Sequence, residues 1–189
     1  RRGYRRARYA GGWAVTCRSR QGAEAALRCA AKILATLGVQ LNLRKTRIVH
    51  VRRGVAFLGY TIKRGQRALY LPAAKITSKA RRGGLYAYPT QKSIDRFKDS
   101  VRRKTQRRIP LRTAELIREL NPVIRGWGEY YKRAHVRRLF NQLDRWIVRR
   151  LWSHRYRRWR CAGWQTLPVR RLRGELGLVS LIGRIPSLT

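Results

Sequence analysis

The side chains best suited to chemistry in this sequence are arginines interleaved with aromatic rings between residues 121 and 160. This stretch holds twelve Arg and Lys residues against Glu129 and Asp144. Planar guanidinium groups bind phosphates through paired hydrogen bonds and stack on exposed bases. Trp127 and Trp146 recur at helical spacing and are expected in a core, whereas the aromatic residues at the end of the stretch suit stacking at the surface. The candidates chosen there by residue type are Arg149, Arg155, Tyr156 and Arg158.

The charge balance of the whole chain points to the same kind of partner. Lys and Arg number 47 against 8 Asp and Glu, which gives a formal net charge of +39. GC-rich coding explains the excess of Arg over Lys, but it does not explain the scarcity of carboxylates. Such a charge opposes compaction unless a polyanion neutralises it. No run of about 18 apolar residues occurs, so nucleic acid is favoured over a membrane.

Carboxylates are nearly missing from the first half of the chain. Glu24 is the only Asp or Glu between residues 1 and 93. Two-metal phosphoryl transfer needs anionic oxygen ligands, because Mg²⁺ prefers hard oxygen donors and must be held in place. The sequence therefore predicts no catalytic residue, no metal site and no cofactor bound by the protein itself. Any Mg²⁺ is expected in the partner RNA.

Cysteine usage and the termini give weaker indications. The three cysteines are widely spaced and lack histidines at zinc-finger intervals, so neither a disulfide framework nor a zinc site is expected. We expect a cytoplasmic ribonucleoprotein, with an organellar one left open. The start at Arg1 and the lack of Met suggest a piece of a longer protein.

The first part of the chain has the pattern of short strands around one helix. Residues 4 to 16 predict a hairpin that turns at Gly11-Gly12. A helix follows from Ala23 to a glycine cap at Gly38. Strands are predicted over residues 39–51, 55–62 and 69–71, since β-branched and aromatic residues are frequent there. Residues 73–89, with Gly83-Gly84, are predicted to be a linker.

Beyond residue 90 the apolar period becomes 3.6, which predicts a helical bundle. Ser93 is expected to cap a first helix, and Thr113 a short second one. Asn121-Pro122 is expected to open a third, and residues 136–152 form the fourth, with its arginines turned away from the apolar stripe. Residues 161–189 are predicted to be an irregular basic tail.

Several segments resemble a group II intron reverse transcriptase and maturase. The most specific is Leu120-Asn121-Pro122-Val123-Ile124-Arg125-Gly126-Trp127-Gly128-Glu129-Tyr130-Tyr131, and Leu37 to Asn42 and Phe57-Leu58-Gly59-Tyr60 also resemble family elements. The family places Asp-Asp where Gly11 and Gly12 stand here, so the resemblance implies degenerate catalytic positions. It further implies an α+β fold with a partial reverse-transcriptase palm over residues 1–72 and a helical thumb, or maturase-specific domain, over residues 90–160.

The resemblance also implies a role for particular side chains in binding intron RNA. On the bundle these residues are Arg125, Tyr131, Lys132, Arg137, Arg138 and Arg145, with Lys92 and Arg96 as a second patch on the first helix.

The leading functional expectation is a maturase-like protein that binds group II intron RNA and stabilises its splicing-competent fold, without polymerase activity of its own. Two alternatives stay open. One is a C-terminal fragment or inactivated form of an RNA-directed DNA polymerase that acts in intron mobility, with DNA as a further partner and a second chain completing the palm. The other is a general basic protein that binds structured RNA.

Overall fold

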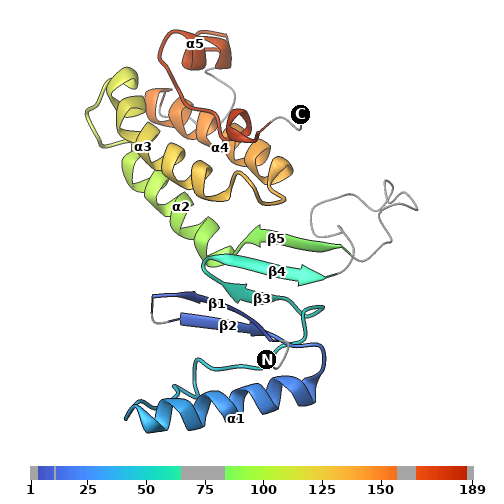
Figure 1. Ribbon diagram of the computed structural model, residues 1–189. Coiled ribbons are helices and arrows are strands. Elements are labelled where there is room, and N and C mark those ends of the chain that lie inside the picture. Colours follow the sequence, from blue (N-terminus) through green and yellow to red (C-terminus); the bar gives the residue numbers. More distant parts are fainter. Residues whose placement is uncertain (1–3, 11, 65–83, 157–164, 187–189) are drawn as a thin grey trace.

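The computed structural model describes residues 4–10, 12–64, 84–156 and 165–186 (Figure 1). Two small antiparallel sheets and one long helix precede a bundle of helices. The expected mixture of α and β structure is therefore confirmed. Every fully buried side chain in the described part of the chain lies between residues 88 and 181, so the bundle holds the core.

The first sheet is a hairpin of β1 (Arg5–Tyr9) and β2 (Gly12–Thr16). Tyr9 pairs with Gly12, so the connection starts at Ala10, whose φ of +48° lies in the left-handed region. The predicted hairpin exists, but the turn assigned to Gly11-Gly12 is wrong by one residue, because Gly12 is already in the ladder. Gly11 lies outside the described residues.

Helix α1 (Arg20–Thr36) begins earlier than the sequence predicted, because the Ser19 hydroxyl accepts a hydrogen bond from the Gly22 N–H at 3.1 Å. Its end is the predicted glycine cap. Gly38 has a φ of +69°, and the Gly38 and Val39 N–H groups donate back to Ala35 and Leu34. This is a Schellman motif, which satisfies carbonyls that the last turn would leave unpaired.

The strand predicted over residues 39–51 is wrong. The Asn42 side chain accepts hydrogen bonds from the Arg44 and Lys45 N–H groups at 3.1 and 3.3 Å, which folds the backbone into a turn. Asn competes in this way with strand pairing through its own side chain. The β-branched Val39, Ile48 and Val49 that suggested a strand stay exposed.

The second sheet contains β3 (Val55–Phe57), β4 (Tyr60–Arg64) and β5 (Leu85–Pro89), all antiparallel. The single strand predicted over 55–62 is therefore two strands, joined at Leu58 and Gly59, whose φ values are +49° and +75°. These angles suit a two-residue hairpin turn. The linker predicted over 73–89 is wrong for residues 85–89, and the predicted strand at 69–71 lies outside the described residues.

Helix α2 (Gln91–Lys104) follows β5 directly. Thr90 caps it, since its hydroxyl accepts from the Ser93 N–H at 3.3 Å, and this position was predicted at Ser93 instead. The predicted stripe of Ile94, Phe97 and Val101 is buried, as is Thr105 at its end.

Helix α3 (Thr113–Tyr131) is continuous through Pro122, where the sequence predicted a break between two helices. Arg112 is its N-cap in place of Thr113, and the Glu115 carboxylate accepts from the Arg112 N–H at 2.9 Å. Proline inside a helix costs about 3 kcal/mol. The buried stripe of Leu116, Leu120 and Ile124 crosses this point without interruption, and its packing outweighs that cost.

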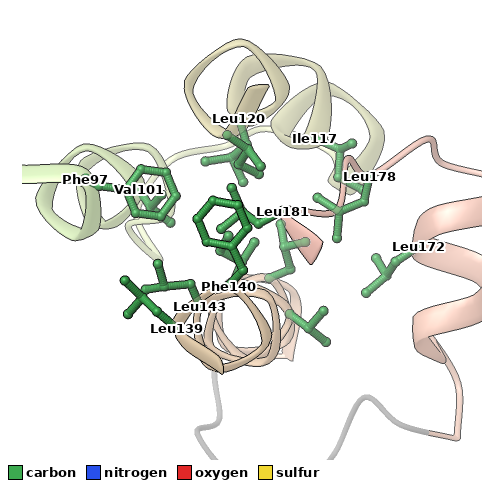
Figure 2. Close-up of a cluster of buried hydrophobic side chains, with 14 of the residues drawn as sticks. Phe97, Val101, Ile117, Leu120, Leu139, Phe140, Leu143, Leu172, Leu178 and Leu181 are labelled. Carbon is green, nitrogen blue, oxygen red and sulfur yellow. The ribbon is translucent and has the colours of Figure 1, made fainter. Parts of the chain in front are cut away.

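Helix α4 (Arg137–Tyr156) completes the core with Phe140 and Leu143 (Figure 2) and with Ile147 and Leu151. The segment after it is not the irregular tail that was predicted. It contains helix α5 (Val169–Gly174) and a 3-10 turn (Ile182–Arg184), and it places further side chains in the same cluster. These buried residues are Leu167, Leu172, Leu178 and Leu181.

Asn121 contributes both to the continuity of α3 and to the order of the segment after α4. Its amide donates to the Gly177 carbonyl at 2.9 Å and accepts from the Val179 N–H at 3.0 Å. The side chain that was expected to cap a helix therefore fastens the C-terminal segment to α3. Among the described residues, no helix is both long and apolar enough to cross a membrane.

Candidate nucleic-acid interface

The aromatic pair Tyr130-Tyr131 joins the second sheet to the bundle. The Tyr130 hydroxyl donates to the Leu58 carbonyl at 2.7 Å, and the Tyr131 hydroxyl donates to the Gly59 carbonyl at 3.0 Å. Tyr60 returns a hydrogen bond to the Tyr130 carbonyl. Desolvation raises the pKa of both Tyr60 and Tyr130, with neighbouring tyrosines adding to the shift. The turn and the end of α3, two segments that suggested the family, therefore contact each other.

Tyr131, one of the predicted RNA contacts, lies buried at this junction between the turn and α3. Its side chain is 3% exposed. Its hydroxyl also lies 2.8 Å from the Ser93 hydroxyl, which accepts a hydrogen bond from the Trp127 indole at 3.3 Å. Its ring packs between Trp127 and Tyr60, with centroids 4.8 Å from each.

We expect Gly59→Ala to weaken the contact between the turn at Gly59 and the end of α3. The new Cβ would lie 2.6 Å from the Tyr131 hydroxyl, and the φ of +75° is strained for any residue with a Cβ. The expected loss in the free energy of unfolding is about 2–4 kcal/mol, measured by urea denaturation. In a Tyr131→Phe background the steric clash is removed, so the loss should fall to roughly 1–2 kcal/mol, the cost of backbone strain at a positive φ.

Gly126→Ala is the matched control for this substitution. No atom lies within 4 Å of a Cβ at this exposed helical position. The control should therefore stabilise the protein by about 0.5–1 kcal/mol. Equal losses in the free energy of unfolding at both glycines would contradict the role assigned to the contact between the turn and α3.

The predicted arginines of α4 form an exposed stripe. At about 100° per residue, Arg138, Arg145 and Arg149 fall within about 40° of one another and span about 16 Å of helix. All three side chains are exposed. Within the described part of the chain, none of them forms an ion pair. We call these three residues the α4 stripe, and Arg137 and Arg155 are exposed on the adjoining face.

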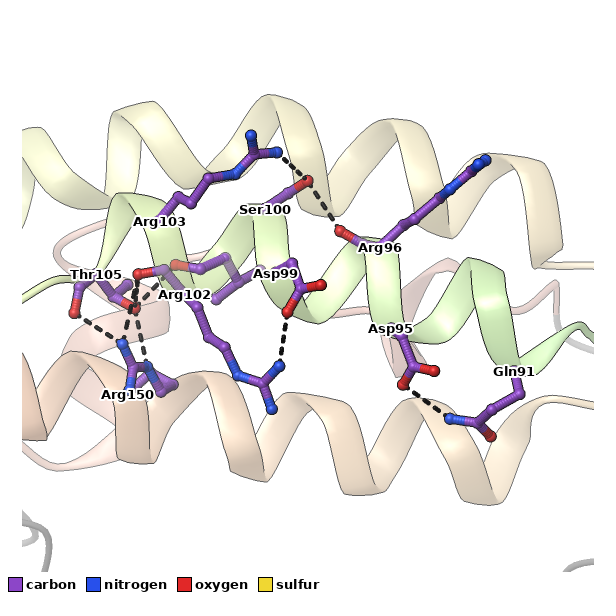
Figure 3. Close-up of polar contacts among 10 residues, drawn as sticks. Gln91, Asp95, Arg96, Asp99, Ser100, Arg102, Arg103, Thr105 and Arg150 are labelled. Atoms are coloured by element: carbon purple, nitrogen blue, oxygen red, sulfur yellow. Dashed lines mark hydrogen bonds and ion pairs between the residues drawn. The ribbon is translucent and has the colours of Figure 1, made fainter.

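The predicted patch of Lys92 and Arg96 is exposed on α2, one turn apart. Figure 3 shows Arg96 and Arg103 extending from a different side of α2 than Arg102, which lies toward α4. Arg125 is exposed on α3.

Other predicted contacts are already engaged within the protein. Lys132 pairs with Glu129 at 2.5 Å, and Glu129 also receives Arg184. Hydrogen bonds from Lys132 and Arg184 lower the pKa of Glu129, although partial desolvation opposes them. Tyr156 packs against the core, and its hydroxyl lies 2.6 Å from the Thr166 hydroxyl. Arg158 lies outside the described residues.

Arg150 shows how an arginine on the same helix takes a structural role instead. Its guanidinium donates to the Thr105 hydroxyl at 2.9 Å and to the Thr105 carbonyl at 3.0 Å, which fixes the end of α2 to α4 (Figure 3). Desolvation and the nearby charges of Arg102 and Arg107 lower its pKa. The apolar period alone does not separate this arginine from those of the α4 stripe.

Sequence reasoning missed Arg173 of α5, which lies beside the α4 stripe. Arg145, Arg149 and Arg173 line one cavity between the two helices. The available signal was Pro168 followed by Leu172 and Leu176, which are four residues apart and follow a helix-compatible start. Because residues 161–189 were expected to be irregular, this helix was not predicted.

The β1–β2 hairpin brings no carboxylate to its turn. The only acid in the first 93 residues is Glu24, which pairs with Arg20 on α1 at 2.9 Å. The described residues contain no cluster of three or more His, Cys, Asp or Glu side chains. The residues near this turn therefore do not fit a pair of Mg²⁺ ions, which require anionic oxygen ligands.

The geometry defines a compact helical domain with an arginine-rich outer surface and a small sheet fastened to one end. Residues 94–172 match the family model of the group II intron, maturase-specific domain. The match extends into α5, past the boundary predicted at residue 160. It confirms the resemblance to the C-terminal portion of a group II intron maturase. No curated protein matches the sequence significantly.

Proposed function

We propose that this protein binds group II intron RNA and stabilises the splicing-competent fold of that RNA. The observation that carries the proposal is the α4 stripe, three exposed arginines without ion pairs in the described structure, within a segment of the maturase-specific family. A compact ribozyme brings phosphates close together, and a rigid cationic surface relieves their repulsion. Catalysis and its Mg²⁺ ions belong to the RNA in this proposal.

To stabilise the folded RNA, the protein must bind it more tightly than it binds the unfolded RNA. A protein shifts an RNA folding equilibrium only by as much as it prefers the folded form. A shift from 1:99 to 99:1 requires a preference of about 10⁴-fold, or about 5.5 kcal/mol. Several arginines that meet phosphates clustered only in the folded RNA provide such a preference, because the unfolded RNA does not present them together.

We further propose that the chain synthesises no DNA by itself. Residues 1–72 correspond in this proposal to part of a reverse-transcriptase palm, and residues 90–186 to the thumb. The support is the position of Gly12 in the hairpin ladder and the pairing of Glu24 with Arg20 at the start of α1. Without carboxylates at the turn, the attacking and leaving oxygens of phosphoryl transfer lack their metal ions.

Competition binding tests the RNA preference. At ~150 mM KCl we expect intron RNA to compete at least ~10-fold better than an unrelated structured RNA of equal length, since specific affinity exceeds the electrostatic part. Equal affinities with equal salt slopes would favour a general basic RNA-binding protein.

Primer extension on an RNA template tests the second half of the proposal. We expect no product above the background of a protein-free reaction. Robust DNA synthesis by the purified chain would contradict the proposal and favour a polymerase that acts in intron mobility.

A further inference from the structure

A cavity of about 330 Å³ lies between α4 and α5, and the proposed RNA binding does not account for its shape. Its lining residues come from successive turns of α4 and from α5. They are Asn141, Asp144, Arg145, Val148, Arg149, Trp152, Val169 and Arg173. We call this cavity the α4–α5 groove.

The floor of the α4–α5 groove is apolar and fixed in position. Val148 is 3% exposed, and Trp152 is partly buried. The Trp152 indole donates to the Leu167 carbonyl at 2.9 Å, which holds the ring in one orientation. An anchored indole is a stacking surface, and each base stacked on an aromatic ring contributes a sequence-tolerant gain in affinity.

The rim of the groove is cationic. Arg145 and Arg149 belong to the α4 stripe, and Arg173 approaches from α5. The one carboxylate, Asp144, is 4% exposed and lies 3.5 Å from Arg173. Its oxygens also accept three hydrogen bonds from residues 180–182, so it is already satisfied by the protein. The groove therefore presents positive charge above an apolar floor.

We infer that the α4–α5 groove receives one unstacked nucleotide of the bound RNA. The base lies against Trp152 and Val148, while the flanking phosphates contact Arg145, Arg149 and Arg173. A duplex does not fit this description, since its bases stack on one another and only its phosphates face outward. The inference rests on the proposed RNA binding and adds the feature of the RNA that the site selects.

Three short RNA hairpins test the inference with the full chain. They are identical except for a single bulged adenosine, an abasic residue at the same bulge, or no bulge. We expect the bulged adenosine to raise affinity about 5- to 100-fold over the abasic bulge, the range for one stacked base. The affinity for the paired hairpin reports the phosphate contacts alone.

Val169→Phe is the diagnostic variant. Val169 is 37% exposed at the edge of the groove, so a phenyl ring fills the groove without a change in charge. We expect the advantage of the bulged adenosine to disappear, while affinity for the paired hairpin and its salt slope stay unchanged. Leu85→Phe adds a ring at a residue that is 62% exposed on β5, and it should change neither.

Photocrosslinking gives a readout that does not depend on the stability of the variant. A 4-thiouridine at the bulge should crosslink to the peptide that contains Trp152. Equal affinity of the unaltered protein for bulged and abasic RNA, with a normal salt slope, overturns the inference and leaves the proposed function standing. Absence of binding to all three hairpins at ~150 mM salt contradicts the proposed function as well.

Discussion

Replacement of Asp144 by Ala lowers the free energy of unfolding by about 3–5 kcal/mol, the range for breaking a buried charged interaction. The carboxylate is 4% exposed and holds three donors at once. The Ser180 hydroxyl donates to it at 2.7 Å, and the Leu181 and Ile182 N–H groups donate at 2.9 and 3.1 Å. The truncation leaves the Leu181 N–H unsatisfied beside a side chain that is 0% exposed.

Urea denaturation followed by circular dichroism measures this loss, and Glu175→Ala is the matched control. Glu175 pairs with Arg171 at the surface, where its side chain is 65% exposed. Exposed ion pairs contribute 1 kcal/mol or less, so the control should lose at most about that amount. Similar small losses for both variants would show that Asp144 does not hold the C-terminal segment in place.

Neutralisation of the α4 stripe should have the largest effect on RNA binding. The triple variant Arg138→Gln, Arg145→Gln, Arg149→Gln removes three charges without touching a described hydrogen bond or ion pair. We expect the slope of log affinity against log salt to fall by about 2–3 units, close to one unit per lost phosphate contact. Affinity for intron RNA at ~150 mM salt should fall roughly 10- to 100-fold.

A second triple variant with the same loss of charge separates a localised interface from general attraction. Arg28→Gln, Lys32→Gln and Arg44→Gln remove exposed charges on and after α1. This control should reduce the slope by less than one unit. If both triple variants flatten the slope equally, the stripe has no special part in binding, and diffuse electrostatics explains the affinity.

Helices with a strong apolar period were predictable from the sequence. The buried stripes of α2 and α4 and the outward arginines of α4 follow from 3.6-residue spacing, since each face has one chemical character. The continuity of α3 through Pro122 was not predictable in this way. It depends on packing along the whole helix and on Asn121, whose partners Gly177 and Val179 lie more than fifty residues away.

Strands and side-chain roles were harder to predict, because they also depend on partners that are distant in the sequence. β-branched residues form strands only where a neighbouring strand is available for backbone hydrogen bonding. Among the described residues no strand pairs with residues 39–50, whereas β5 pairs with β4 despite its place in a predicted linker. The resemblance assigned Tyr131 to RNA binding, whereas its hydroxyl donates to the carbonyl of Gly59, 72 residues earlier in the chain.

The attachment of the last segment to α3 and α4 has a consequence during translation. Leu172, Leu178 and Leu181 enter a cluster that also contains residues from α2, α3 and α4. A nascent chain that stops before these residues have left the ribosome exposes the apolar surface they later cover. The bundle therefore completes its core only after residue 181 emerges.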